Sequence, residues 1–257
     1  KLHWTLHPEK AVDLYEDENG KKRSPWYDQE CKRCAHPQEI AQELDIDFAA
    51  SDYQFFDALE LNKIMHKDCR PPIMTGDLVF DDKSCEPSNF SRGKGALSLW
   101  INPDAAGKIP KDRKYAIGVD IATGTGASNS VISVGDCNTG EKVAELCSPN
   151  LRPDQLGRYA VALAKWFTGN TPGGAYMIWE APGPGRNFGD VVLEHGHRNI
   201  YFRTNETSVT KKHSTIPGWW PTKDEKRSIY AEYRRALSSG RFINRSKPAI
   251  EECREII

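Results

Sequence analysis

Two acidic residues, Asp120 and Glu180, each follow a short apolar run that is typical of a buried strand. The runs are YAIGV, from Tyr115, and AYMIW, from Ala175. An ionised carboxylate at the end of a buried strand is costly unless another charge compensates it. A divalent cation supplies that charge, and carboxylate oxygens suit Mg²⁺ or Mn²⁺. Asp120 and Glu180 are therefore predicted to be catalytic metal ligands, holding two ions about 4 Å apart that activate water in phosphodiester cleavage.

Each carboxylate also has a purely structural interpretation. Asp120 could cap the loop formed by residues 121–128, and Glu180 could pair with Arg186. Two acids on different strands can converge on one ion pair, whereas residues within one strand cannot. Two such strand ends, with basic residues downstream, favour the metal site over the structural interpretation.

A basic stretch lies between residues 223 and 247, although the net charge of the whole chain is only −1. Its basic residues are Lys223, Lys226, Arg227, Arg234, Arg235, Arg241, Arg245 and Lys247. We predict that DNA phosphates are bound by Arg186, Lys223, Lys226, Arg227, Arg234, Arg235 and Arg241. Arg186 is included among the predicted DNA-binding residues because it should lie at the start of a helix, after the loop APGPG. The alternatives are a solvated helix face for the basic stretch and a rigid turn without a ligand for this loop.

Three other motifs carry weaker signals. The loop after Asp120, ATGTGASNS, contains Gly124 and Gly126 but is neither GxxxxGK[ST] nor followed by a helical pattern. Cys31 and Cys34 form a CxxC near His36, which zinc could use with His66 and Cys69, but ordinary thiols are favoured. The pair Trp219-Trp220 lies in a loop at 204–221, either as part of a mobile flap or as an anchor to the core; the anchor is favoured.

The pattern of apolar residues predicts the elements that position these groups. Strand-like runs at 77–80 and 96–101 suggest a hairpin. Strands at 115–120, 130–135 and 142–146 should form an antiparallel meander, followed by a helix at 153–167, a strand at 175–180, a helix at 187–195, a strand at 200–202 and helices at 223–238 and from 248. This order predicts an α/β fold of the RNase H-like class: a mixed sheet, three meandering strands plus parallel strands, flanked by helices.

Residues 1–75 differ in character. Short helical patterns begin at Ser24, as an N-cap before Pro25, and at residues 37–44 and 57–66. This small helical segment with a linker is predicted to be separate from a domain at 76–257. The chain has no apolar run of about 18 residues, so no membrane association is expected. It also lacks an initiator Met, and we expect it to be an internal part of a longer, intracellular protein.

The sequence resembles the large terminase subunit of tailed bacteriophages. The similarity lies in HWTLHPEK, in SPWYDQECKRC and IAQELDIDFAASDYQFFD, and in YAIGVDIATGTGASNS. The resemblance implies that 1–75 is the end of a packaging ATPase region with its linker, without the Walker motifs. It implies an RNase H-like nuclease at 76–257, with Asp120 and Glu180 as the first two acids of a triad. The third acid, on a C-terminal helix in that family, has no match before Ile257, and Asn129 stands where many members have an acid.

The resemblance further implies an endonuclease that cuts concatemeric double-stranded DNA at the start and end of packaging. Its cofactor would be Mg²⁺ or Mn²⁺, and its location the cytoplasm of the infected bacterial host. Its partners would be its own ATPase domain, the small terminase subunit and the portal or prohead. Two alternatives stay open: a non-enzymatic module of the same fold that docks DNA or a prohead, and a relative of the actin and sugar-kinase ATPases.

Overall fold

The computed structural model describes residues 3–18, 20–33, 40, 44, 55–204 and 213–256. The chain forms two compact units, one made of residues 1–63 and 250–257 and the other of residues 64–249. This division differs from the expected boundary after residue 75, and the assignment of those two parts to an ATPase end and a nuclease stays a prediction. Among the described residues, no helix combines the length and apolar character needed to cross a membrane.

The first unit begins with short elements. They are η1 (Trp4–Leu6), β1 (Tyr15–Glu16), β2 (Lys22–Arg23) and α1 (Pro25–Arg33). As predicted, Ser24 caps the helix that starts at Pro25, since the backbone N–H of Tyr27 donates to Ser24 Oγ at 3.1 Å. Tyr27 is buried against Trp4, with ring centroids 4.9 Å apart. The unit also holds η4 (Cys253–Glu255), and the helices α3 (Ala58–Asp68) and α7 (Lys247–Glu252) run across the division.

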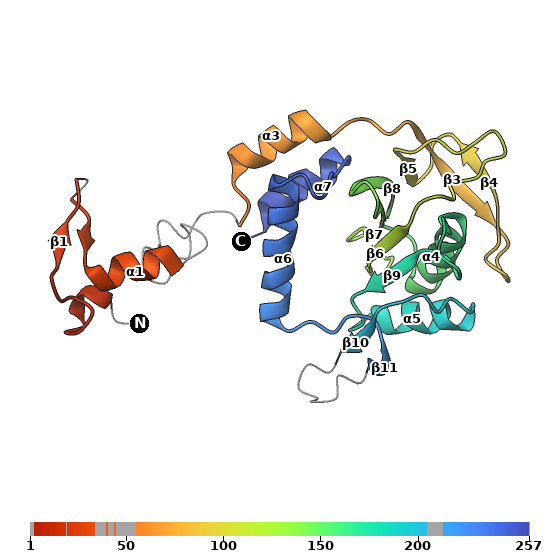
Figure 1. The fold of residues 1–257 in the computed structure, drawn as a ribbon. Helices are drawn as coiled ribbons and strands as arrows, with labels where there is room; N and C mark the ends of the chain where they lie inside the picture. Colours follow the sequence, from red (N-terminus) through yellow and green to blue (C-terminus); the bar gives the residue numbers. More distant parts are fainter. Residues whose placement is uncertain are drawn as a thin grey trace. The chain divides into compact units, whose positions relative to one another are not determined.

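The second unit is built around a seven-stranded mixed sheet with the order β4-β3-β5-β8-β7-β6-β9 (Figure 1). Its strands are β3 (Met74–Phe80), β4 (Pro87–Arg92), β5 (Leu97–Leu99), β6 (Tyr115–Asp120), β7 (Ser130–Asp136), β8 (Glu141–Ser148) and β9 (Tyr176–Trp179). The remaining elements are α4 (Pro153–Trp166), α5 (Gly185–Glu194), β10 (Phe202–Thr204), β11 (His213–Pro217) and α6 (Lys223–Ser238).

The topology confirms the predicted fold class. Strands β6, β7 and β8 form an antiparallel meander, and β9 pairs with β6 in parallel after the helix α4. The helix α6 has the predicted bounds, and α4 ends one residue before the prediction. A three-strand meander followed by a helix and a parallel strand beside the first strand is the RNase H-like arrangement.

Two predicted strand assignments are wrong in detail. A simple hairpin of 77–80 with 96–101 would leave only a loop between these two runs, but residues 87–92 form β4 at the sheet edge, and β3 pairs with both β4 and β5. The fifth strand expected at 200–202 is reduced to a single bridge between Ile200 and Met177. Residues 202–204 instead form a hairpin with β11.

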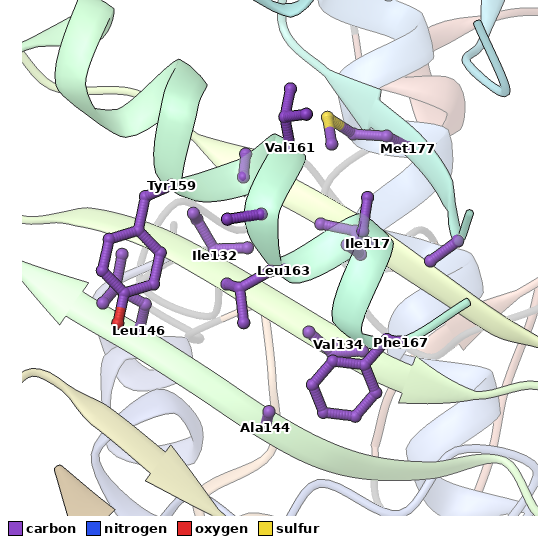
Figure 2. Packing of buried hydrophobic residues seen from close by; sticks show 14 of the residues in the cluster. Ile117, Ile132, Val134, Ala144, Leu146, Tyr159, Val161, Leu163, Phe167 and Met177 are labelled. Atoms are coloured by element: carbon purple, nitrogen blue, oxygen red, sulfur yellow. The ribbon is translucent and has the colours of Figure 1, made fainter. Parts of the chain in front are cut away.

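The core lies between the sheet and α4. Figure 2 shows Val161 of this helical segment beside Met177 of the sheet, and Leu163 and Phe167 on the side of Val134. All five residues have no exposed surface, and fully burying one such large side chain stabilises the fold by about 1.5–3 kcal/mol. The core therefore fixes the register and the ends of the strands that carry the candidate site.

Candidate metal centre at the ends of two parallel strands

Asp120 and Glu180 lie beside each other because of the register of β6 and β9. The last paired residues of these parallel strands are Val119 and Trp179, so the two acids are the next residues along each chain. Neighbouring strands in a sheet lie about 4.8 Å apart. Successive side chains point to opposite faces, so both carboxylates leave the sheet on the face opposite Val119 and Trp179. The two acids that were predicted to end different buried strands therefore lie at the ends of neighbouring strands.

The face that carries the carboxylates is open near Asp120. Asp120 is exposed, and its carboxylate has no hydrogen-bond or ion-pair partner among the described residues, while its backbone pairs with Val131 of β7. A Cβ added at Gly118, two residues earlier on the same face, would meet no heavy atom within 4 Å. The proposed capping of the loop by Asp120 is not seen, since the N–H of Ala122 donates instead to Ser130 Oγ at 3.0 Å. This side of β6 therefore has room for a cation and a substrate.

Glu180 is held by its own backbone. Trp219 forms a parallel bridge with Glu180. The N–H of Ala181 donates to the Trp219 carbonyl at 2.8 Å, and the N–H of Trp219 donates to the Trp179 carbonyl at 2.8 Å. The backbone of Trp219 thus holds its segment at the end of β9. An anchor to the core by the tryptophan side chains stays a prediction, and residues 205–212, which the flap interpretation involves, lie outside the described residues.

Two glycines, Gly185 of the APGPG loop and Gly218, allow close packing around the same strand end. Trp179, 2% exposed, donates from Nε1 to the Gly185 carbonyl at 3.1 Å. A Cβ on Gly185 would approach the Glu180 carbonyl oxygen to 1.9 Å, and one on Gly218 would approach Ala181 to 2.8 Å. The absence of side chains at these positions lets three backbone segments meet beside Glu180.

The carboxylate of Glu180 pairs with Lys226 rather than with Arg186. Lys226 Nζ lies 2.8 Å from Glu180 Oε1, with 42% and 38% of the two side chains exposed. The guanidinium of Arg186 lies over the Trp220 ring instead, 5.2 Å from its centroid. Arg186 is the second residue of α5, as expected from the sequence. Lys226 was predicted to bind DNA. Its contact with Glu180 could not be predicted from the sequence, because the two residues are far apart along the chain.

The other predicted DNA-binding residues divide into two groups. Lys223 and Arg227 are exposed and have no ion-pair partner among the described residues, and Arg234 lies on the same side of α6 by helical spacing. Arg235 and Arg241 both pair with Glu232. Elsewhere in the basic stretch, Arg245 is 8% exposed. It donates to Glu141 Oε1 at 2.5 Å and to the Asp68 carbonyl at 2.8 Å, so it has a structural role.

The residues at the site fit one divalent cation of the magnesium type. Two carboxylates on one open face supply hard oxygen ligands, and Mg²⁺ commonly takes only one or two carboxylates beside waters and phosphate. No group of three or more His, Cys, Asp or Glu side chains suited to a metal occurs in the described part of the chain. The described residues therefore offer no third carboxylate for a second ion at this place.

The remaining motifs are the glycine-containing loop that follows Asp120 and the cysteine motif near the start of the chain. Gly124 and Gly126 have φ angles of 75° and 88°. A Cβ on Gly124 would approach the Leu151 carbonyl to 2.7 Å, so its loop packs against the chain itself. Cys31 and Cys69 are half-buried, and the Cys69 thiol donates to the Asn244 carbonyl at 3.6 Å. Cys34 and His36 lie outside the described residues, as does most of the helical pattern expected at 37–44.

The chain matches no protein-family model and no curated protein sequence. Among solved structures it is similar to the large terminase nuclease from thermophilic phage G20c with bound magnesium, at 16% identity and a TM-score of 0.48 over 72% of this chain and 81% of that chain. The same nuclease with bound zinc has 16% identity and a TM-score of 0.46, covering 69% and 87%. The large terminase nuclease domain of Thermus phage P74-26 has 13% identity and a TM-score of 0.46, covering 76% of each chain.

Proposed function

We propose that this chain is a metal-dependent endonuclease of a viral DNA-packaging motor, which cuts concatemeric double-stranded DNA at the start and end of packaging. The observation that carries the proposal is the parallel register of β6 and β9, which sets Asp120 and Glu180 side by side on an open face. The resemblance of the sequence to large terminase subunits supplies the biological setting. That setting is the cytoplasm of an infected bacterium, with the ATPase domain, the small subunit and the prohead as partners.

In this proposal, different residues of the site bind the metal and the DNA backbone. Asp120 and Glu180 would hold Mg²⁺ or Mn²⁺, which supplies the Lewis acid that activates water and stabilises the leaving oxygen. Lys223, Arg227 and Arg234, on one side of α6, would hold the DNA backbone beside the carboxylates. Phosphate contacts carry no sequence information, so such a site would cut with little sequence preference. A second ion, which the two-metal reaction requires, would need ligands in addition to these two acids.

Substitution of each carboxylate tests the proposal. Asp120→Asn and Glu180→Gln remove a charge with little change of volume, and we expect Mn²⁺-dependent nicking of a supercoiled plasmid to fall about 100-fold or more. Asp82→Asn, in an exposed loop of the same unit, is the matched control and should nick like the wild type. Circular dichroism and melting curves verify that the variants are folded.

Two outcomes would contradict the proposal. Folded Asp120→Asn and Glu180→Gln proteins that nick at the wild-type rate would show that these carboxylates are not the catalytic ligands. A wild-type protein that binds duplex DNA but does not cut it with any divalent cation would favour the non-enzymatic docking module.

A further inference from the structure

The contact between Lys226 and Glu180 places an ammonium group on a carboxylate that we propose as a metal ligand. The two charged atoms are 2.8 Å apart, and neither side chain is buried. Asp120, the other proposed ligand, has no such partner among the described residues. One of the two candidate ligands is therefore already neutralised by a cation of the protein, while the other is free.

The start of α6 is fixed relative to Glu180. Trp219 bridges Glu180 directly, and the chain then reaches Thr222, which caps the helix. The N–H of Glu225 donates to Thr222 Oγ1 at 3.2 Å, and the N–H of Lys226 donates to the Thr222 carbonyl at 3.1 Å. Lys226 therefore leaves the first turn of a capped helix that is tied to the strand end.

The far end of α6 is also fixed. Lys226, Tyr233 and Leu237 recur at helical spacing and share one face. Leu237 is 3% exposed, and Tyr233 Oη accepts a hydrogen bond from Asn244 Nδ2 at 2.8 Å. Because both ends of this face are held, the direction of the Lys226 side chain toward Glu180 follows from the fold.

We propose that Lys226 competes with the divalent cation for the Glu180 carboxylate. When the cation binds, the Lys226 ammonium leaves the carboxylate and binds a DNA phosphate. The inference rests on the proposed function. A lone pair of Glu180 Oε1 that accepts a hydrogen bond from Lys226 cannot at the same time coordinate a cation. In addition, the positive charge of a bound divalent cation repels the Lys226 ammonium. A solvent-exposed ion pair of this kind contributes little free energy, so the cation can displace it. The long, flexible lysine side chain can then turn to a phosphate on the same open face.

This exchange couples metal binding to DNA binding. Without the cation, Lys226 is engaged with Glu180 and contributes nothing to the DNA. With the cation, it adds one phosphate contact. By linkage, DNA must then raise the affinity for the cation by the same factor as the cation raises the affinity for DNA.

The first test measures metal affinity without DNA. Mn²⁺ is titrated into the full chain by calorimetry, with the free ion followed by its electron paramagnetic resonance signal. We expect Lys226→Met to bind Mn²⁺ about two- to fivefold more tightly than the wild type, the range that an exposed ion pair allows. Lys226→Arg, which keeps the pair, and Lys108→Met, at an exposed site, should bind like the wild type. In a Glu180→Gln background, Lys226→Met should have no further effect.

The outcomes separate the two proposals. If Mn²⁺ affinity depends on Asp120 and Glu180 but Lys226→Met leaves it unchanged, the competition is overturned and the proposed function stands. If the wild type binds no Mn²⁺, or binds it equally well without the two carboxylates, both are overturned.

The second test measures the affinity for a short DNA duplex against salt concentration, without divalent ions and with Ca²⁺, while a gel verifies that the duplex stays uncut. Lys226→Met should reduce the salt slope by about 1 with Ca²⁺ and leave it unchanged without Ca²⁺. Lys223→Met, on the same helix but without a carboxylate partner among the described residues, should lower the slope in both conditions. An equal effect of Lys226→Met in both conditions would overturn the release of Lys226 by the cation.

Discussion

At the scale of single residues, the charged side chains of the site could be picked out in the sequence. Which of them pair with one another could not be predicted from it. Asp120 and Glu180 stood out because each ends an apolar run, and the register of β6 and β9 sets them side by side. Glu180 had an obvious nearby cation in Arg186, yet it pairs with Lys226. The reason is that Trp220 holds the Arg186 guanidinium while Trp219 and the capped start of α6 bring Lys226 to the carboxylate. Contacts of this kind depend on tertiary structure and leave no periodic signal.

A second residue-scale feature predicts how stability depends on pH. His197 is 4% exposed, and burial lowers the pKa of its imidazole, with the charges of Lys165 and Arg198 acting in the same direction. Its Nε2 atom has no hydrogen-bond partner among the described residues. The folded state therefore favours neutral His197, while the unfolded chain protonates it at about pH 6.5.

We expect this histidine to reduce stability in acid. Its contribution is fully present above about pH 6.5 and is lost as the pH falls below that value toward the lowered pKa, at up to about 1.4 kcal/mol per pH unit. Urea unfolding of the wild type and of His197→Gln between pH 7.5 and pH 5 measures this. The variant should lose less stability over the range, and equal slopes would contradict the burial of a neutral imidazole.

At the scale of elements, most of the site-bearing fold could be predicted, because β6, β7 and α4 have regular patterns of apolar residues. The wrong assignments fall where the pattern is short or polar. Strand β4, with the sequence PSNFSR, lies at an edge and has no buried residue, so nothing in its side chains marks it as a strand. Ile200 continues the sheet by one bridge only, because the chain then turns into the β10–β11 hairpin.

The turn after β9 gives a prediction at this scale. A methyl group on Gly185 would lie 1.9 Å from the Glu180 carbonyl oxygen, which is backbone and cannot move alone. We expect Gly185→Ala to cost about 1–3 kcal/mol of unfolding free energy, as overpacking does. Because a misplacement of about 1 Å can lower a rate about 100-fold, nicking should fall more than stability explains.

The matched control is Gly135→Ala in β7, whose new methyl group would meet only Phe242, at 3.8 Å. This variant should keep both stability and nicking near the wild-type values. Gly185→Ala protein that melts and nicks like the Gly135→Ala control would show that the close packing at Glu180 is unimportant for the site.

At the scale of the whole molecule, the buried core and the candidate site belong to the same unit. The large hydrophobic cluster runs from Met74 to Ile200, and both proposed metal ligands and Lys226 lie within residues 64–249. A separate, smaller cluster is formed by Trp4, Tyr27 and Leu44. The stability of the site should therefore not depend on the first residues of the chain.

Deletion of residues 1–54 tests this independence. We expect residues 55–257 to show one cooperative melting transition, within about 3 °C of the main transition of the full chain, because no member of the large cluster is removed. Scanning calorimetry of both proteins provides the comparison. Loss of the cooperative transition on deletion would mean that residues 1–54 contribute to the stability of the sheet.

The central claim, that Asp120 and Glu180 form a divalent metal site, is tested most directly by a crystal of the wild-type protein soaked in Mn²⁺. We expect anomalous density between the two carboxylates, with oxygens of both at about 2.0–2.3 Å from the ion, and Lys226 turned away from Glu180. A fully soaked crystal without anomalous density at these carboxylates, with Lys226 still on Glu180, would contradict it.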